Sequence, residues 1–318
     1  MSRHPLTSKL HAADVLIIGF FLFLSLLNVL FAGRIPHWAT LVAINLGVIA
    51  LILLLASARH ATGSKLLAFV HDWYVPPMVF FSFKELYYMV RPIHLGRDYD
   101  AELIGIDRML FGVDPTVWLG QYAHPLITEI LQIAYTSFFL LFLILGYELY
   151  RRRNLDLFRF YVFACTYGFF LSYVGYFLLP AVGPRFTLHD FSALDSELPG
   201  LWLTPALRWF VNAGESIPMG VSSAEALAGT QRDVFPSGHT MMMLVMMFFG
   251  VRYRLKVRYL LNVTGALLII ATVYQRYHYV IDLAAGAAFA ILCIATAPAL
   301  YMFIRGHFRT LEEAAPPK

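Results

Sequence analysis

Long, uninterrupted runs of apolar residues are the feature that most constrains the fold of this chain. A helix needs about 20 consecutive apolar residues to cross a bilayer, where every backbone polar group must be hydrogen-bonded within the protein. Such runs recur throughout the 318 residues, of which 59% are hydrophobic and only 14% are charged. The sequence therefore predicts an all-α, polytopic transmembrane bundle and excludes an ordinary soluble domain or a disordered chain.

About eight segments satisfy this length criterion. The third is the least regular, because it contains histidine, aspartate, lysine and two prolines, and the sixth is short but almost entirely apolar. Between the spans, residues 93–125 and 181–235 are too long for simple turns, and part of the first is amphipathic and expected to lie in the interface. The predicted spans are residues 15–32, 38–56, 66–90, 126–147, 157–180, 237–250, 259–274 and 283–304.

Lysine and arginine predict the orientation of these spans. If the N-terminus lies inside, the inner loops contain the basic clusters 151–153 and 252–258, so both termini are expected inside. The net charge of +4 then reports topology, and the sequence contains no zinc finger or basic DNA-reading helix. Cys165 and Cys293 lie in apolar runs without neighbouring histidines and are interpreted as packing residues.

The first of three polar motifs lies at the outer end of the third span. Lys84 and Arg91 are about two helical turns apart, so they share one face, and Pro92 would end the helix. A lysine within a span costs roughly 2.5–3.5 kcal/mol on insertion scales and therefore needs a partner or a role. The alternative to anion binding is that Lys84 pairs with Glu85 or extends to the surface.

The second motif, Pro236-Ser237-Gly238-His239, begins the sixth span. Proline suits the first turn of a helix, where free backbone N–H groups form an anion site. Gly238 permits close approach of a ligand, Ser237 adds a hydroxyl donor, and His239 titrates near neutral pH. By itself this motif is also consistent with a simple helix start.

The third motif ends the seventh span on the same side. His278 and Asp282 are four residues apart, hence one turn apart if the stretch is helical, and the carboxylate would fix the imidazole tautomer. A structural His–Asp pair is the alternative interpretation. Arg185, at the end of the fifth span, is expected either to contact a phosphate or to balance nearby acids, and these acids are Asp190, Asp195 and Glu197.

Together these motifs predict a site for a phosphate ester. Fixed cations and a helix N-terminus would stabilise charge on the phosphoryl oxygens, while two histidines would serve the nucleophile and the leaving group. The sequence contains no HExxH motif, acidic metal cage or P-loop, so no metal, nucleotide or other cofactor is expected.

At these residues the sequence resembles the phosphatidic acid phosphatase type 2 superfamily. Its first two motifs match at Lys84, Arg91 and Pro92, and at residues 236–239. The third matches at His278 and Asp282, but the position of its arginine is occupied here by Thr272, and either Arg185 or Arg276 would have to replace it. The segments GIDRMLFGVDPTVWL, YFLLPAVGPRF and HYVIDLAAG resemble the inositol phosphorylceramide synthase branch.

The resemblance implies a mechanism. His278 would attack phosphorus to form a phosphohistidine, Asp282 would orient it, and His239 would protonate the leaving oxygen. The phosphoryl oxygens would be held by Lys84, Arg91, Ser237, Gly238 and Arg185. Because one histidine must start neutral and the other protonated, a bell-shaped pH profile is expected.

The resemblance also implies the substrate class and the location of the site. The donor would be a phospholipid or lipid phosphate among membrane lipids, with the site on the outer side, and no nucleic acid is expected as a partner. An alcohol acceptor would make the protein a phosphotransferase of sphingolipid metabolism, and water would make it a phosphatase. Residues 66–305 would form the catalytic membrane domain, after an N-terminal helix pair (1–65) and before a cytoplasmic tail (306–318).

Two other classes of function stay open from the sequence. Charged groups within the third span, namely His71, Asp72 and Lys84, would also suit an ion path in a transporter. The clustering of charge at one end and the absence of paired broken helices argue against it. An inactive scaffold that has kept the motifs is the other alternative, because the third-motif arginine is displaced.

Overall fold

Apolar helices dominate the protein, as the sequence predicts. The computed structural model describes residues 9–218 and 220–313, and within that part of the chain it contains helices and no strand. Five helical segments are long and apolar enough to cross a membrane. They are α1 (Ala12–Leu30), α2 (Trp38–Thr62), the pair α3 (Lys65–Trp73) and α4 (Val75–Ile93), α9 (Leu155–Leu178), and Val280–Gly306 within α16 (Val280–Glu313).

The other three expected spans are also helical but less regular. The expected span 126–147 consists of α7 (Pro125–Thr136) and α8 (Phe138–Arg151), which are bent by 50° at Ser137 and together form a possible sixth crossing. The last two are the shorter α14 (Gly238–Arg252) and α15 (Arg258–Tyr274). The prediction that the chain crosses the membrane eight times therefore stays a prediction, as does the inner position of the termini.

Local sequence explains where the irregular span breaks. Between α3 and α4 the chain turns at Tyr74, and Pro76 and Pro77 follow in the first turn of α4. Proline is tolerated there because the first-turn N–H groups have no partner within the helix. At the other end of the chain, α16 continues to Glu313 into the expected tail, of which residues 314–318 lie outside the described part.

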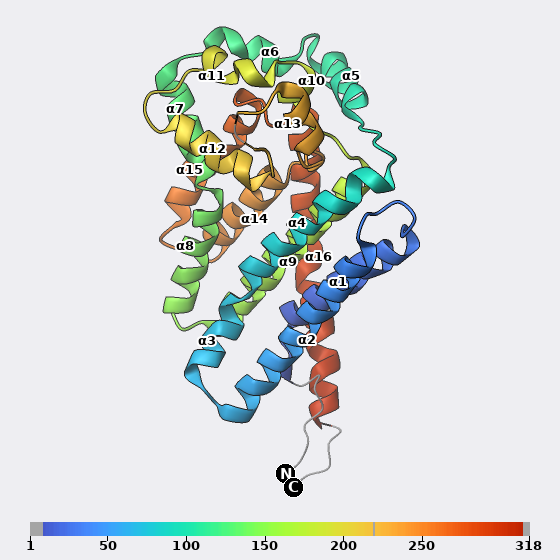
Figure 1. Ribbon diagram of the computed structural model, residues 1–318. Helices are drawn as coiled ribbons and strands as arrows, with labels where there is room; N and C mark the ends of the chain where they lie inside the picture. The colour runs from blue at the N-terminus through green and yellow to red at the C-terminus, as the bar shows by residue number, and fades with distance from the viewer. Residues whose placement is uncertain (1–8, 219, 314–318) are drawn as a thin grey trace.

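Short helices gather at one end of the bundle (Figure 1). Exposed apolar side chains such as Met109, Leu110 and Trp118 lie on this cap and suit the amphipathic segment expected in residues 93–125. The cap consists of α5 (Asp100–Phe111), α6 (Pro115–Leu119), η2 (Gly120–Tyr122), α10 (Pro184–Thr187), η3 (Phe191–Ala193), α11 (Leu194–Glu197), α12 (Thr204–Gly214) and α13 (Ser223–Gly229).

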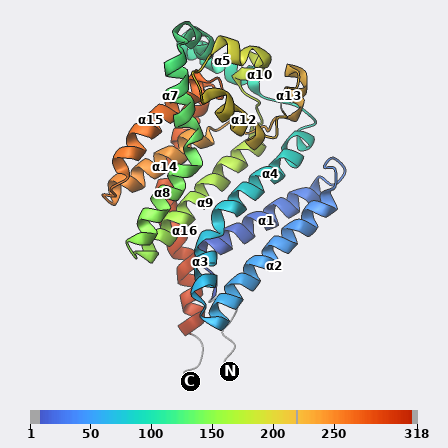
Figure 2. The same ribbon diagram turned by 60° about the vertical axis from the view of Figure 1, so that its left-hand side comes forward.

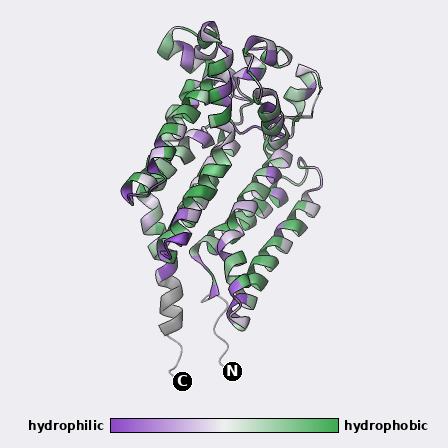
Figure 3. Ribbon diagram, turned by 90° about the vertical axis from the view of Figure 1, so that its left-hand side faces the viewer, coloured by the Kyte–Doolittle hydropathy of each residue, from purple (hydrophilic) through white to green (hydrophobic). Residues whose placement is uncertain are grey.

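The central helix is α9, which packs against α1, α4, α8, α14 and α16. It lies between α4 and α8 (Figure 2). On one side of α9, a hydrophobic core includes Leu145, Phe163 and Met242, and on the other a second core includes Phe21, Met89 and Phe170. The long helices are largely hydrophobic along their length (Figure 3), as expected for helices in lipid.

Candidate active site

His239 lies in the first turn of α14, next to the short helices of the cap. Ser237 caps this helix, because its hydroxyl accepts a hydrogen bond from the Thr240 N–H at 3.2 Å. The imidazole ring of His239 contacts two aromatic rings, with centroids 4.5 Å from Tyr135 and 4.4 Å from Phe138. These contacts hold the ring in one orientation at the end of the helix.

His278 lies just before α16, not within it as the helical i,i+4 interpretation required. The Thr272 carbonyl accepts the N–H groups of Tyr277 and His278, which turns the chain back at the end of α15. The His278 Nδ1 atom is then 3.4 Å from Asp282 Oδ2, which also accepts the Tyr279 N–H at 2.8 Å. The predicted pairing therefore forms, but through a turn that leads into the helix.

The two histidines face each other across the ends of α14 and α16. Their ring centroids are 6.0 Å apart, and the Ser237 N–H donates to the Asp282 carbonyl at 3.0 Å. This close contact needs a glycine, because a Cβ atom at Gly286 would lie 2.6 Å from the Ser237 carbonyl oxygen. A single backbone hydrogen bond thus fixes the two helix ends that carry the histidines.

Arg185 lies beside this pair. Its guanidinium carbon is 4.9 Å from the centroid of the Tyr277 ring, and its positive charge adds to burial in lowering the pKa of His278. Its side chain forms an ion pair with Glu215 and donates to Asn212 at 3.3 Å. The acids of the alternative interpretation have other partners, since Arg208 pairs with Asp195 and Arg276 pairs with Glu197.

Arg276 is directed away from the histidines. It adopts a left-handed backbone conformation (φ 66°), and its side chain pairs with Glu197 in the cap. Of the two arginines considered for the missing motif position, the geometry thus favours Arg185.

Lys84 reaches the same loop as Arg185. Its ammonium group donates to the Gly214 carbonyl and, at 2.9 Å, to the Ser216 hydroxyl. Its neighbour Glu85 is instead buried against two asparagines, and it accepts from Asn28 and Asn45. Lys84 therefore faces the cap and not its acidic neighbour.

Arg91 lies apart from these cations. Its side chain is exposed and donates to the Ala228 carbonyl of α13 at 3.1 Å. A role for Arg91 in holding phosphate would require a rearrangement of that contact.

Asp233 lies among the candidate site residues and was not predicted from the sequence. Its charge interacts with those of His278, Arg185 and Lys84, three groups from different parts of the chain. Burial raises the pKa of the Asp233 carboxyl, and the nearby positive charges oppose that rise. Its position, three residues before the Pro-Ser-Gly-His motif, is the signal that would have found it.

A large apolar cavity leads away from the histidines into the bundle. It has a volume of about 770 Å³ and extends from His239 and Asp233 to Trp73 and Gly146. Its walls come from α3, α4, α7, α8, α9 and α12, and most of the side chains that line it are aromatic or aliphatic. Phe80 of α4 and Phe139 of α8, both substantially exposed, line the cavity and meet edge to face with ring centroids 6.4 Å apart.

Comparison with known proteins identifies the family. The profile of the PAP2 superfamily matches residues 101–296, which is more than half of the chain. The chain belongs to the PAP2 superfamily. The matched region contains His239, His278 and Asp282, whereas Lys84 and Arg91 lie before it.

Membership in the PAP2 superfamily and the apolar helices together show that this is an integral membrane protein of a phosphatase superfamily. No curated protein and no solved structure matches the chain.

Proposed function

We propose that this PAP2 superfamily protein transfers the phosphoryl-containing headgroup of a membrane lipid through a phosphohistidine on His278. One observation carries the proposal: the His239–His278 pair, with ring centroids 6.0 Å apart, lies at the end of an apolar cavity of about 770 Å³. A phosphate ester with long hydrocarbon tails matches both parts of this arrangement.

The reaction begins with attack of a neutral His278 nitrogen on phosphorus. The bond from phosphorus to the leaving oxygen breaks, and His239 gives its proton to that oxygen. Asp282, 3.4 Å from His278 Nδ1, orients the ring and stabilises the positive charge that develops on it. In the second step an acceptor hydroxyl attacks phosphorus, His239 removes its proton, and His278 leaves as the neutral base.

Charge on the phosphoryl oxygens is stabilised by the cations around the histidines. We assign this role to Lys84 and Arg185, together with Ser237 and Gly238 at the start of α14. Arg91 would join them only after leaving its contact with Ala228.

The acceptor decides between the two activities of this proposal. The resemblance to the inositol phosphorylceramide synthase branch favours an alcohol such as a ceramide, which makes the protein a lipid phosphotransferase. The alternative is a lipid phosphate phosphatase that uses water. Both proceed through the same covalent intermediate.

We place the site on the outer side of the membrane. The basic clusters at residues 151–153 and 252–258 lie at the ends of α8 and α14, whereas His239 lies at the opposite end of α14. Positive clusters of this kind mark inner loops.

The test is turnover by purified protein in proteoliposomes. Phosphatidic acid, a polyprenyl diphosphate and phosphatidylinositol would each be supplied with and without a ceramide, and the products identified by mass spectrometry. We expect headgroup release or transfer, together with acid-labile phosphate on the protein, and His278→Ala should lose both.

His37→Asn is the matched control, because His37 is exposed at the start of α2. Turnover that persists in His278→Ala would refute the nucleophile assignment, and absence of turnover with all three donors would refute the substrate class.

A further inference from the structure

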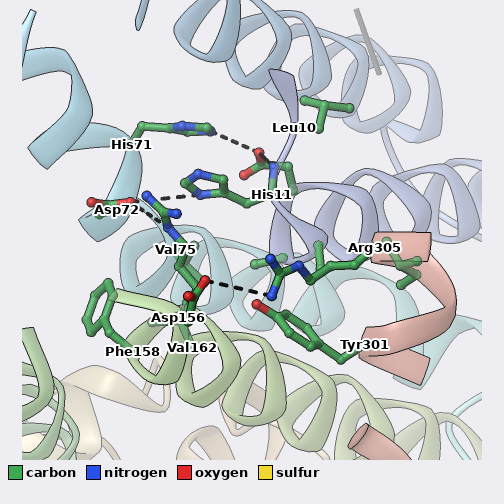
Figure 4. Close-up of a pocket in the computed structure, with 15 residues that line it drawn as sticks. Leu10, His11, His71, Asp72, Val75, Asp156, Phe158, Val162, Tyr301 and Arg305 are labelled. Atoms are coloured by element: carbon green, nitrogen blue, oxygen red, sulfur yellow. Dashed lines mark hydrogen bonds and ion pairs between the residues drawn. The ribbon is translucent and has the colours of Figure 1, made fainter. Parts of the chain in front are cut away.

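A second polar site lies at the other end of the bundle from the histidine pair. It surrounds a cavity of about 320 Å³ between the start of α1, the end of α3, the start of α9 and the last part of α16 (Figure 4). Along α9, Phe158 at this cavity and Tyr176 near His239 are 18 residues apart, which corresponds to about 27 Å of helix. The histidine pair and this polar cluster thus lie far apart along α9, although the far end of the apolar cavity reaches the residues Asp72, Val75, Phe158 and Val162 that also line this site.

Two histidines in this site direct lone pairs at one point. His11 Nε2 is 2.5 Å and His71 Nδ1 is 2.8 Å from the Nη1 atom of Arg59. A guanidinium group donates hydrogen bonds and accepts none, so both ring nitrogens must be unprotonated acceptors. The rings stack with centroids 4.4 Å apart, which keeps both nitrogens on the same side.

A carboxylate faces the other nitrogen of each histidine. His71 Nε2 donates to Asp14 Oδ2 at 2.9 Å, and His11 Nδ1 lies 3.9 Å from Asp72 Oδ1. The latter oxygen is buried and has no hydrogen-bond partner among the described residues. A carboxylate behind each imidazole is the arrangement that orients histidines bound to a metal ion.

The two nitrogens that face Arg59 accept its hydrogen bonds and therefore carry no proton, as metal binding requires. One ring nitrogen from each of His11 and His71 and one carboxylate oxygen of Asp14, which stands behind His71, lie within 4.8 Å of one another. Metal binding therefore needs little movement of these side chains.

We propose that this cluster is a binding site for a divalent transition-metal ion of the Zn²⁺ class. In the metal-free protein the guanidinium group of Arg59 occupies the position of the ion. His11 and His71 supply the nitrogen ligands, and water in the polar cavity completes the coordination. Imidazole ligands select zinc-like ions over magnesium or calcium, which prefer sets of oxygen ligands.

Arg59 is able to leave without unfolding the site. It lies in the last turn of α2, and 23% of its side chain is exposed. Its withdrawal leaves three carboxylates, those of Asp14, Asp72 and Asp156, against two arginines among the described lining residues, namely Arg305 and Arg159, whose Nε atom is 3.6 Å from Asp72. The pocket then has excess negative charge, which a divalent cation compensates.

The site joins two elements that are far apart in the sequence. His11 precedes α1 and His71 ends α3, so a shared ion would clamp the N-terminal helix onto the rest of the bundle. Binding to the folded state alone would raise the thermal transition temperature in proportion to the logarithm of the metal concentration.

The test is metal binding by the full chain in detergent, after removal of any affinity tag and treatment with a chelator. Co²⁺ would be titrated and followed by its visible d–d absorption, and Zn²⁺ would be used to displace it. We expect one ion per chain, and Arg59→Leu should bind roughly tenfold more tightly because a hydrogen-bonded competing charge is gone. His11→Ala and His71→Ala should lose the absorption band.

Controls separate a lost ligand from a lost fold. His37→Asn should bind as the wild type does, and His71→Gln should retain the metal-free transition temperature but lose the metal-dependent rise. If neither the wild type nor Arg59→Leu retains Co²⁺ better than His71→Gln does, the proposal is refuted and the cluster is an internal ion-pair network. Because Phe158 at this site and Tyr176 near the histidine pair are about 27 Å apart along α9, lipid turnover should be unchanged in His71→Gln.

Discussion

Gly146 offers a direct test of whether a lipid tail occupies the long apolar cavity. It lies on α8 at the end of the cavity that is remote from His239. A Cβ atom added there would lie 3.4 Å from the Trp73 ring and 3.5 Å from the Tyr161 ring, which is ordinary van der Waals contact. Alanine therefore fits, whereas the ring of a Gly146→Phe variant must project into the cavity.

The size of the effect follows from helix geometry and packing. From Phe138 to Gly146, α8 lines about 12 Å of the cavity, and a phenylalanine at position 146 fills the last helical turn, about 5 Å. A tail outside the cavity lies in lipid, not in water, so the hydrophobic effect contributes little to chain-length selection. The main cost is overpacking, about 1–3 kcal/mol, or roughly 5-fold to 150-fold in kcat/KM.

The assay compares lipids that share one headgroup and differ only in tail length, in proteoliposomes of fixed composition. We expect Gly146→Phe to lower kcat/KM by that factor for the longest tails and to leave short tails unaffected. Gly146→Ala should resemble the wild type. Gly19→Phe is the matched control, because Gly19 is exposed on α1 and a Cβ there meets no described atom within 4 Å.

Two outcomes would contradict the reasoning. An equal loss for every tail length would mean that the substitution disturbs the fold and not the chain-length limit. An unchanged kcat/KM for the longest tails would mean that the tail does not enter the cavity.

Three further predictions concern the chemistry. His239→Ala should lower kcat most for lipids with poor leaving groups. The measurement is the dependence of the rate on the pKa of the leaving group, which should become steeper in the variant. A loss of rate that is independent of the leaving group would contradict the acid role. Burial lowers the pKa of His278 to about 4, so its neutral form persists above that pH. On the acid side, kcat/KM should therefore decline with an apparent pKa near 4. A decline with an apparent pKa near 6.5 would refute this. Glu215→Gln removes the charge that pairs with Arg185 and should lower KM by about five- to thirty-fold, whereas a raised KM would show that Glu215 supports the site.

The sequence predicts the helices well because lipid imposes a length rule on them. Each expected span is helical, and the Pro-Ser-Gly-His motif begins a helix as its proline and serine indicate. The bend at Ser137 has no comparable signal, since neither proline nor glycine marks it and the apolar run continues through it. A hydropathy pattern therefore predicts the segments but not their continuity.

The site was predictable where short motifs carry it. His278 and Asp282 are close in sequence, so their pairing follows from local spacing even though His278 precedes the helix. Asp233 and Glu215 lie in a long loop whose path depends on contacts with the cap, so periodicity gives no information about them. The pairing of His11 with His71 is likewise invisible in the sequence, because it depends on how α1 packs near α3.

The exposed contact between Phe80 and Phe139 has a consequence for kinetics. Because these two rings line the cavity and are also exposed on α4 and α8, a lipid would reach the histidines sideways from the bilayer, between these helices. Turnover would then depend on the mole fraction of substrate within the membrane and not on its bulk concentration. A diacylglycerol product would remain in the same two-dimensional phase, so it would accumulate beside the enzyme and compete for the cavity as the reaction proceeds.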